Sequence, residues 1–107
     1  MKKTLKLILT NKWFEEIKSG RKTHEYRVMS EYWKNRFNYK SRTKGVYIPC
    51  TVIENFPYDK VEFQRAFYKK PEKMTFYIKK VTLQRGQETD LRYDGGVFDI
   101  ELGTRIK

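Results

Sequence analysis

Several segments of this chain carry apolar side chains at every second position, the spacing of a β-strand with one buried face. Leu5, Leu7 and Leu9 follow this alternation, and it returns over residues 60–68 and 74–83. The stretches with helical spacing are short, so helices could not form the core by themselves. This pattern predicts a mainly β fold, and it constrains the architecture more than any other feature of the chain.

Two short helices are predicted near the N-terminus. Asn11 is expected to cap the first helix, and Gly20 is expected to end it in a left-handed conformation. Ser30 is expected to cap a second helix, which carries Trp33 and Phe37.

Three further extended segments complete the predicted fold, at residues 22–28, 46–54 and 97–102. Pro49 lies in the second of these and favours an edge position or a bulge there. The expected fold class is α+β, mainly β: a small β-barrel of five or six strands with two short helices near the N-terminus. Residues 1–107 are expected to form a single domain.

The charge balance of the chain is strongly positive. Its 24 Lys and Arg residues outnumber its 13 Asp and Glu residues, which gives a formal net charge of +11. Such a field attracts polyanions, of which nucleic acid comes first and an acidic protein or a membrane surface second. The alternative is that the charge serves solubility alone.

The chain contains one cysteine and one histidine. Cys50 has no partner for an internal disulfide, which favours a reducing cytoplasm. Cys50 and His24 do not form a cluster with zinc spacing, so no metal and no cofactor are expected. The apolar run after Met1 is interrupted by Lys6, and it reads as a strand rather than a signal peptide. No membrane partner is expected, and the oligomeric state is left open.

A basic stretch with interleaved aromatic residues follows the second predicted helix. No acidic residue occurs between Tyr32 and Ile53. Cations that contact phosphates, alternating with rings that stack on bases, are typical of single-stranded nucleic-acid binding. The alternative is a helix with core-facing rings and solvated cations. The candidate nucleic-acid patch consists of Trp33, Lys34, Arg36, Lys40, Arg42 and Lys44.

The segment from Ser19 to Arg27, SGRKTHEYR, is the strongest candidate for a site. An extended backbone would place Lys22, His24 and Tyr26 on one face and Glu25 and Arg27 on the other. One interpretation is structural: Glu25 and Arg27 form an ion pair that fixes the strand. His24 is expected to be a structural or surface residue.

The other interpretation is a ligand site. Gly20 permits a close backbone approach and begins a cationic nest that could hold an anion. Lys22, if crowded by Arg21 and partly desolvated, becomes a plausible base or nucleophile, with Glu25 as its proton shuttle.

The same segment resembles a known protein family. The spacing Gly20-x-Lys22-x-x-Glu25-x-Arg27, behind a helix that carries Trp13, is similar to the G-x-K-x-x-E-x-R hallmark of the ASCH (activating signal cointegrator homology) domain. The resemblance extends to the segments 5–7, 58–63 and 97–103 and is strongest to small prokaryotic and phage-borne members.

The resemblance implies a PUA-like β-barrel with the hallmark residues lining a cleft that binds RNA or a nucleotide. It also implies two alternatives: a hydrolase of acetylcytidine-type nucleosides or RNA phosphodiesters with Lys22 and Glu25 as catalytic residues, or a basic protein-interaction adaptor. The amidohydrolases of the family carry Thr at the position of Glu25. The expected ligand-binding residues are Trp13, Gly20, Arg21, Lys22, Glu25, Tyr26 and Arg27.

Overall fold

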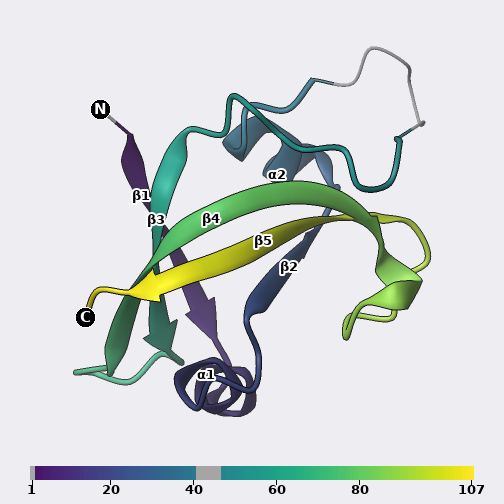
Figure 1. Cartoon of the computed structure of the whole chain (residues 1–107). Helices are drawn as coiled ribbons and strands as arrows, with labels where there is room; N and C mark the ends of the chain where they lie inside the picture. Colours follow the sequence, from purple (N-terminus) through teal and green to yellow (C-terminus); the bar gives the residue numbers. More distant parts are fainter. Residues whose placement is uncertain (1, 41–46) are drawn as a thin grey trace.

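One five-stranded sheet, open and strongly curled, forms the body of the molecule (Figure 1). The structure is a computed structural model that describes residues 2–40 and 47–107. With its two short α-helices it confirms the α+β, mainly β class. In chain order the elements are β1 (Lys3–Leu9), α1 (Asn11–Lys18), β2 (His24–Val28), α2 (Glu31–Arg36), β3 (Tyr58–Arg65), β4 (Lys73–Arg85), the 3-10 turn η1 (Gly86–Glu88) and β5 (Gly96–Arg105).

The strand order separates the two strands that flank α1. The order in the sheet is β1-β3-β4-β5-β2, so β1 and β2 lie at opposite edges although only α1 and its flanking turns separate them in sequence. β1 pairs with β3 in parallel, and the other three pairings are antiparallel. α1 lies at the end of the sheet where β1 finishes (Figure 1). The chain thus crosses from one edge to the other before β2 begins.

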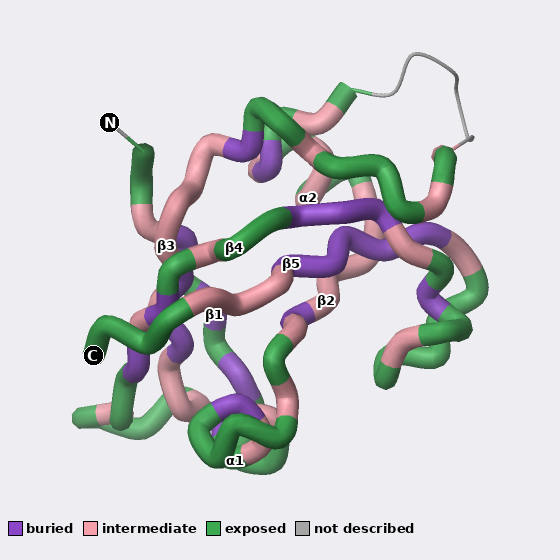
Figure 2. The backbone as a smooth tube through the Cα atoms, viewed as in Figure 1, coloured by how far each residue is buried: buried purple, intermediate pink, exposed green. Residues whose placement is uncertain are grey.

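The core confirms the alternation in the first strand. Leu5, Leu7 and Leu9 are buried, whereas the residues between them are exposed. α1 contributes Phe14 and Ile17 to the same cluster because both point towards the sheet. The longest buried stretch covers residues 96–100 at the start of β5, beside β4 (Figure 2). The first half of β5 therefore lies in the interior, where it supports β2 from one side.

Two of the three predicted helix ends are confirmed. Gly20 follows α1 with φ +85°, a left-handed conformation that costs glycine little. The Ser30 hydroxyl accepts a hydrogen bond from the Trp33 backbone N–H and caps α2. The prediction for Asn11 is wrong: Thr10 is the N-cap residue, without a side-chain cap, and the Asn11 side chain donates to the Tyr68 hydroxyl instead. A tertiary contact thus takes the group that was expected to cap the helix.

The predicted strand at 46–54 is wrong for the residues that the structure describes. Residues 47–53 run beside β4 but make one isolated bridge, from Val52 to Thr82. Cys50 has φ +67°, which interrupts the extended backbone that a strand requires. The bond from Ile53 N–H to the Val81 carbonyl fixes the end of the segment against β4.

The remaining differences concern strand ends. β3 stops at Arg65 rather than at residue 68, because Ala66 has φ +49° and donates its N–H to the Leu9 carbonyl. β5 continues to Arg105, past the predicted end at residue 102. Within the described ranges, neither helix has the length and hydropathy needed to cross a membrane.

Candidate functional site

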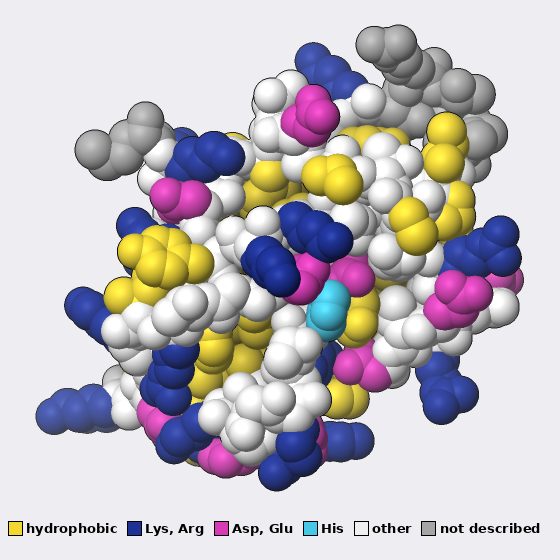
Figure 3. All heavy atoms as spheres, in the orientation of Figure 1, with side chains coloured by type: hydrophobic (Ala, Val, Ile, Leu, Met, Phe, Trp, Pro, Cys, Tyr) yellow, Lys and Arg dark blue, Asp and Glu magenta, His cyan; other side chains and the backbone are white. Residues whose placement is uncertain are grey.

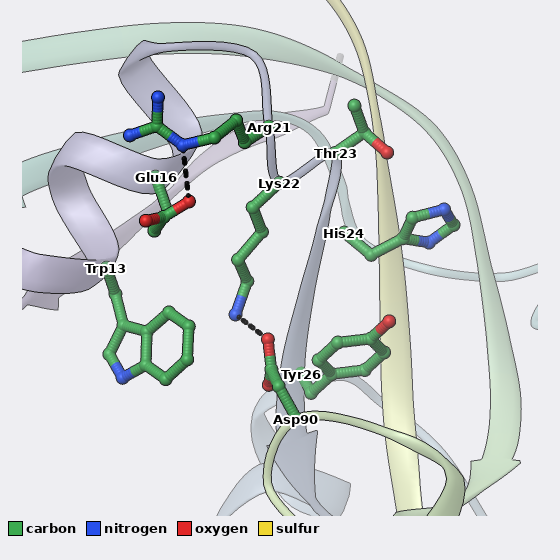
Figure 4. Close-up of a pocket in the computed structure, with 8 residues that line it drawn as sticks. All are labelled: Trp13, Glu16, Arg21, Lys22, Thr23, His24, Tyr26 and Asp90. Atoms are coloured by element: carbon green, nitrogen blue, oxygen red, sulfur yellow. Dashed lines mark hydrogen bonds and ion pairs between the residues drawn. The ribbon is translucent and has the colours of Figure 1, made fainter.

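A cavity of about 350 Å³ lies where α1, β2 and the loop after η1 come together (Figure 4). Among the strands that the structure describes, β2 is an edge strand with β5 as its one partner, so its other side remains open to side chains from α1 and from the loop. Four of the seven predicted ligand-binding residues line this cavity. The lining residues are Trp13, Glu16, Arg21, Lys22, Thr23, His24, Tyr26 and Asp90.

The Lys22 side chain extends into the middle of this cavity and is only 10% exposed. Its Nζ atom lies 2.7 Å from Asp90 Oδ2 and 3.4 Å from Glu25 Oε1. The same atom lies 4.2 Å from the centre of the Trp13 ring and 5.4 Å from that of Tyr26. The ammonium group is therefore enclosed by two carboxylates and two ring faces, all of which attract a cation.

Glu25 connects Lys22 to Arg27, and the predicted Glu25–Arg27 pair is present. The Glu25 side chain is 5% exposed, and its Oε2 atom lies 3.1 Å from Arg27 Nη2. Its Oε1 atom faces Lys22 and also accepts a bond from the Tyr26 backbone N–H. Both oxygens are thus engaged, which suits Glu25 to organising the site.

Arg27 lies beside the cavity rather than in its wall. Its guanidinium stacks 5.4 Å from the centre of the Trp33 ring, while its Nε atom is buried without a hydrogen-bond partner among the described residues. Within the described part of the chain, the cluster formed by Lys22, Glu25 and Arg27 therefore has a free donor, which can bind one more hydrogen-bond acceptor.

His24 and Asp99 form a pair next to Tyr26, on the side of its ring that faces away from Lys22 (Figure 4). His24 Nδ1 lies 2.7 Å from Asp99 Oδ1, and the His24 ring stacks on Tyr26 with centres 6.3 Å apart. Burial raises the pKa of Asp99 above its usual value, although hydrogen bonding to His24 acts in the opposite direction. Burial, followed by the charges of Asp99, Asp90 and Glu25, raises the pKa of the Tyr26 phenol to about 12. Tyr26 therefore stays a neutral hydrogen-bond donor over the physiological range.

Arg21 and Gly20 do not take the positions expected of them. Arg21 turns back to α1, where its Nε atom donates to Glu16 Oε2 over 2.9 Å, and its side chain is 65% exposed. The close neighbours of Lys22 are therefore carboxylates and rings, not the crowding cation that was expected. A Cβ atom built on Gly20 would meet nothing within 4 Å, so Gly20 serves the turn and not a close approach.

Sequence reasoning missed Glu16, Thr23 and Asp90 as lining residues, and Asp90 is the one of them that pairs with the Lys22 ammonium. It lies 68 positions from Lys22 in the chain, in a polar loop with no motif around it. Gly86 shapes this loop: its N–H donates to the Gly95 carbonyl, and a Cβ atom at Gly86 would lie 2.5 Å from the Tyr93 carbonyl oxygen. Near Asp90, the sequence offered one local indication of a site: an acidic residue a few positions after Gly86.

The described residues of the predicted nucleic-acid patch, Trp33, Lys34, Arg36 and Lys40, are not among those that line the cavity. Trp33 packs against the core and stacks on Phe37, 5.2 Å between ring centres. Arg36 donates to the hydroxyls of Tyr32 and Tyr58, and these bonds raise the pKa of Arg36. Of the remaining cations, Lys34 faces Glu31 at 3.5 Å, Lys40 is exposed, and Arg42 and Lys44 lie outside the described residues.

Basic side chains are spread over the face drawn in Figure 3, with acidic side chains among them. Across residues 2–40 and 47–107, no group of three or more His, Cys, Asp or Glu residues is placed to hold a metal ion. No protein-family model matches the chain, and no similar protein was found among curated proteins or solved structures.

Proposed function

We propose that this chain is an RNA- or nucleotide-binding protein of the ASCH type, with its ligand held in the cavity around Lys22. The observation that carries the proposal is the position of the Lys22 ammonium between the rings of Trp13 and Tyr26. Ring faces that border a cavity can stack on a base, and proteins that bind unpaired RNA use aromatic side chains in this way.

The size and polarity of the cavity support a nucleotide. Its volume of about 350 Å³ is at the lower end of the range of about 300–1,000 Å³ that holds small ligands. The wall offers donors from Lys22 and Tyr26 and acceptors from Glu16 and Asp90. A base edge carries both donors and acceptors, so this mixed wall suits it better than a uniformly basic wall would.

Exposed cations near the rim add outer phosphate contacts in this proposal. Arg21 lines the cavity with most of its side chain in solvent, and Lys12 lies 4.7 Å from the centre of the Trp13 ring. The net charge of +11 adds a long-range attraction for RNA. Each phosphate neutralised on a single strand contributes about −0.7 to the slope of log K against log salt.

The test is a titration with short single-stranded RNA and with mononucleotides, followed through tryptophan fluorescence and isothermal calorimetry. We expect Lys22→Gln and Trp13→Ala each to weaken binding by about tenfold or more. Lys73→Gln is the matched control, since the Lys73 ammonium pairs with Glu62 on β3, at 3.6 Å, and Lys73 does not line the cavity. Equal affinity of all three variants and the parent protein, or no RNA and nucleotide binding at low salt, would refute the proposal.

A second candidate is a small hydrolase, which the 3.4 Å approach of Glu25 to Lys22 favours. It predicts that acetylcytidine or RNA is converted to product, and that Lys22→Ala stops turnover without unfolding the protein. Binding alone predicts no product, with a loss of affinity in the same variant. Binding to an acidic protein, in the absence of any RNA binding, would favour the adaptor function instead.

A further inference from the structure

The buried cluster of Lys22, Glu25 and Arg27 contains two positive charges and one negative charge. Lys22 and Arg27 share one carboxylate, that of Glu25, and the three side chains are 10%, 22% and 5% exposed. Buried charges are stable only when they are paired, so the cluster needs one more anion. The unpaired buried Nε atom of Arg27 indicates the same shortage of acceptors in the described part of the chain.

Asp90 supplies that anion from outside the sheet. Its Oδ2 atom lies 2.7 Å from Lys22 Nζ, closer than Glu25, although its own side chain is 31% exposed. Figure 4 shows the carboxylate reaching the tip of Lys22 from the loop, on the side opposite α1. A carboxylate that meets a recessed ammonium from the solvent side takes the position in which an external anion would bind.

The loop can release Asp90 without disturbing the sheet. Among the described residues, the other hydrogen bonds of residues 87–94 close within the loop: Thr89 and Tyr93 bond to Gly86, Leu91 and Arg92 bond to Thr89, and Gln87 bonds to Asp94. The Lys22–Asp90 pair is thus the polar link between this loop and the segment that leads into β2. Breaking it costs one partly exposed ion pair, while Glu25 and Arg27 remain in place.

We infer that Lys22 is an anion subsite, and that Asp90 occupies it in place of the ligand's phosphate or carboxylate group. This inference rests on the proposed ligand site, and it specifies which atom receives the ligand's charged group. An entering anion displaces Asp90 and takes over the hydrogen bond from Nζ. The loop then swings away from β2, so the affinity for anions reflects a competition between the ligand and Asp90.

The experiment is a titration of ¹⁵N-labelled protein with inorganic phosphate and pyrophosphate, followed by amide chemical shifts. Removing the competitor should strengthen binding, so we expect Asp90→Asn to bind both anions about tenfold more tightly than the parent chain, the scale of one hydrogen bond to a charged group. Asp94→Asn is the matched control, since it removes the same charge from the same loop without touching Lys22. Adding Lys22→Gln to Asp90→Asn should abolish the gain.

An Asp90→Asn protein that is folded and binds phosphate no better than the parent, or no better than Asp94→Asn, overturns the inference. Should Asp90→Asn fail to fold, the parent chain still decides: phosphate must shift the amide signals of Lys22 and of the loop, and unchanged signals overturn the inference. If the parent binds nucleotides but Asp90→Asn binds phosphate no better than the parent, only the Asp90 inference is refuted. Tighter phosphate binding by Asp90→Asn without any nucleotide binding refutes only the nucleotide proposal.

Discussion

His24 and Asp99 form a diagonal pair across the two strands β2 and β5, with 2.7 Å between Nδ1 and Oδ1. Asp99 stands opposite Tyr26 in the register, and its side chain leans towards the neighbouring histidine. Burial nevertheless has the larger effect on the pKa of Asp99, because this residue is only 9% exposed. The pair therefore connects the cavity to the pH dependence of the fold.

Asp99→Asn should remove part of the pH dependence of the free energy of unfolding. The pKa of Asp99 is raised in the folded state, mainly by burial, so its contribution to stability is fully present below the ordinary value of 3.8 and is lost as pH rises through the raised pKa. We expect the free energy of unfolding of the parent, relative to Asp99→Asn, to fall between about pH 3 and pH 7. Urea denaturation across this range measures the difference.

The exposed Asp94, replaced by Asn, provides the control for the loss of one carboxylate. Its unfolding free energy should follow that of the parent at every pH. A difference between parent and Asp99→Asn that rises with pH would mean that hydrogen bonding to His24 outweighs burial, contrary to the expectation.

Glu25→Gln should destabilise the protein by about 3 kcal/mol, because the change leaves Lys22 and Arg27 without their shared buried carboxylate. Glu31→Gln is a suitable comparison: Glu31 faces Lys34 at 3.5 Å with a side chain that is 84% exposed, and its loss should cost less than about 1 kcal/mol. Guanidinium unfolding of the two variants gives both values. Similar losses for both would show that Glu25 does not organise the cluster.

Asp90→Asn should lower the pKa of Tyr26 from its value of about 12, since the Asp90 charge is one of the groups that raise it. Labelling the tyrosine Cζ carbon with ¹³C and assigning the signal with Tyr26→Phe would isolate this phenol from the other seven. Burial is the largest cause of the shift, so most of it should remain. An unchanged Tyr26 titration would place the Asp90 carboxylate farther from the ring than the structure has it.

Gly86→Ala should strengthen nucleotide binding, because displacing the loop moves Asp90, the competitor for Lys22, away from the site. Its Cβ atom would lie 2.5 Å from the Tyr93 carbonyl oxygen, a distance that backbone atoms cannot accommodate without moving. Gly103→Ala is the milder counterpart, because its nearest contact is 3.3 Å, to the Tyr77 carbonyl oxygen. Thermal unfolding and nucleotide titration of the two proteins would separate the effects, and equal behaviour would contradict the role assigned to Gly86.

Local sequence patterns predicted those parts of the fold that local interactions determine. The alternation of Leu5, Leu7 and Leu9 located β1, and the left-handed residue after α1 was visible as Gly20. The cap of α1 was missed because the Asn11 amide bonds to Tyr68, which is 57 positions away. Side-chain competition of this kind depends on the tertiary fold and leaves no signal in a short window.

For the site too, local sequence patterns predicted the contacts between residues close in sequence but not those between distant residues. The pairing of Glu25 with Arg27 follows from strand alternation, which places residues two positions apart on one face. The contacts of Lys22 with Asp90 and of His24 with Asp99 join residues more than 60 positions apart. Sequence could therefore identify one wall of the cavity, but not the loop and the strand that complete it.

The place of β2 at the sheet edge also determines when the cavity can exist. Among the named strands β2 has one partner, β5, whose residues are synthesised some 70 positions later. A growing chain emerges from the ribosome in sequence order, so Lys22 and Glu25 wait in an unpaired segment until residues 90–101 have followed them. The cavity can thus be completed only after β5 has been synthesised, and a nascent chain that lacks β5 has no site to occupy.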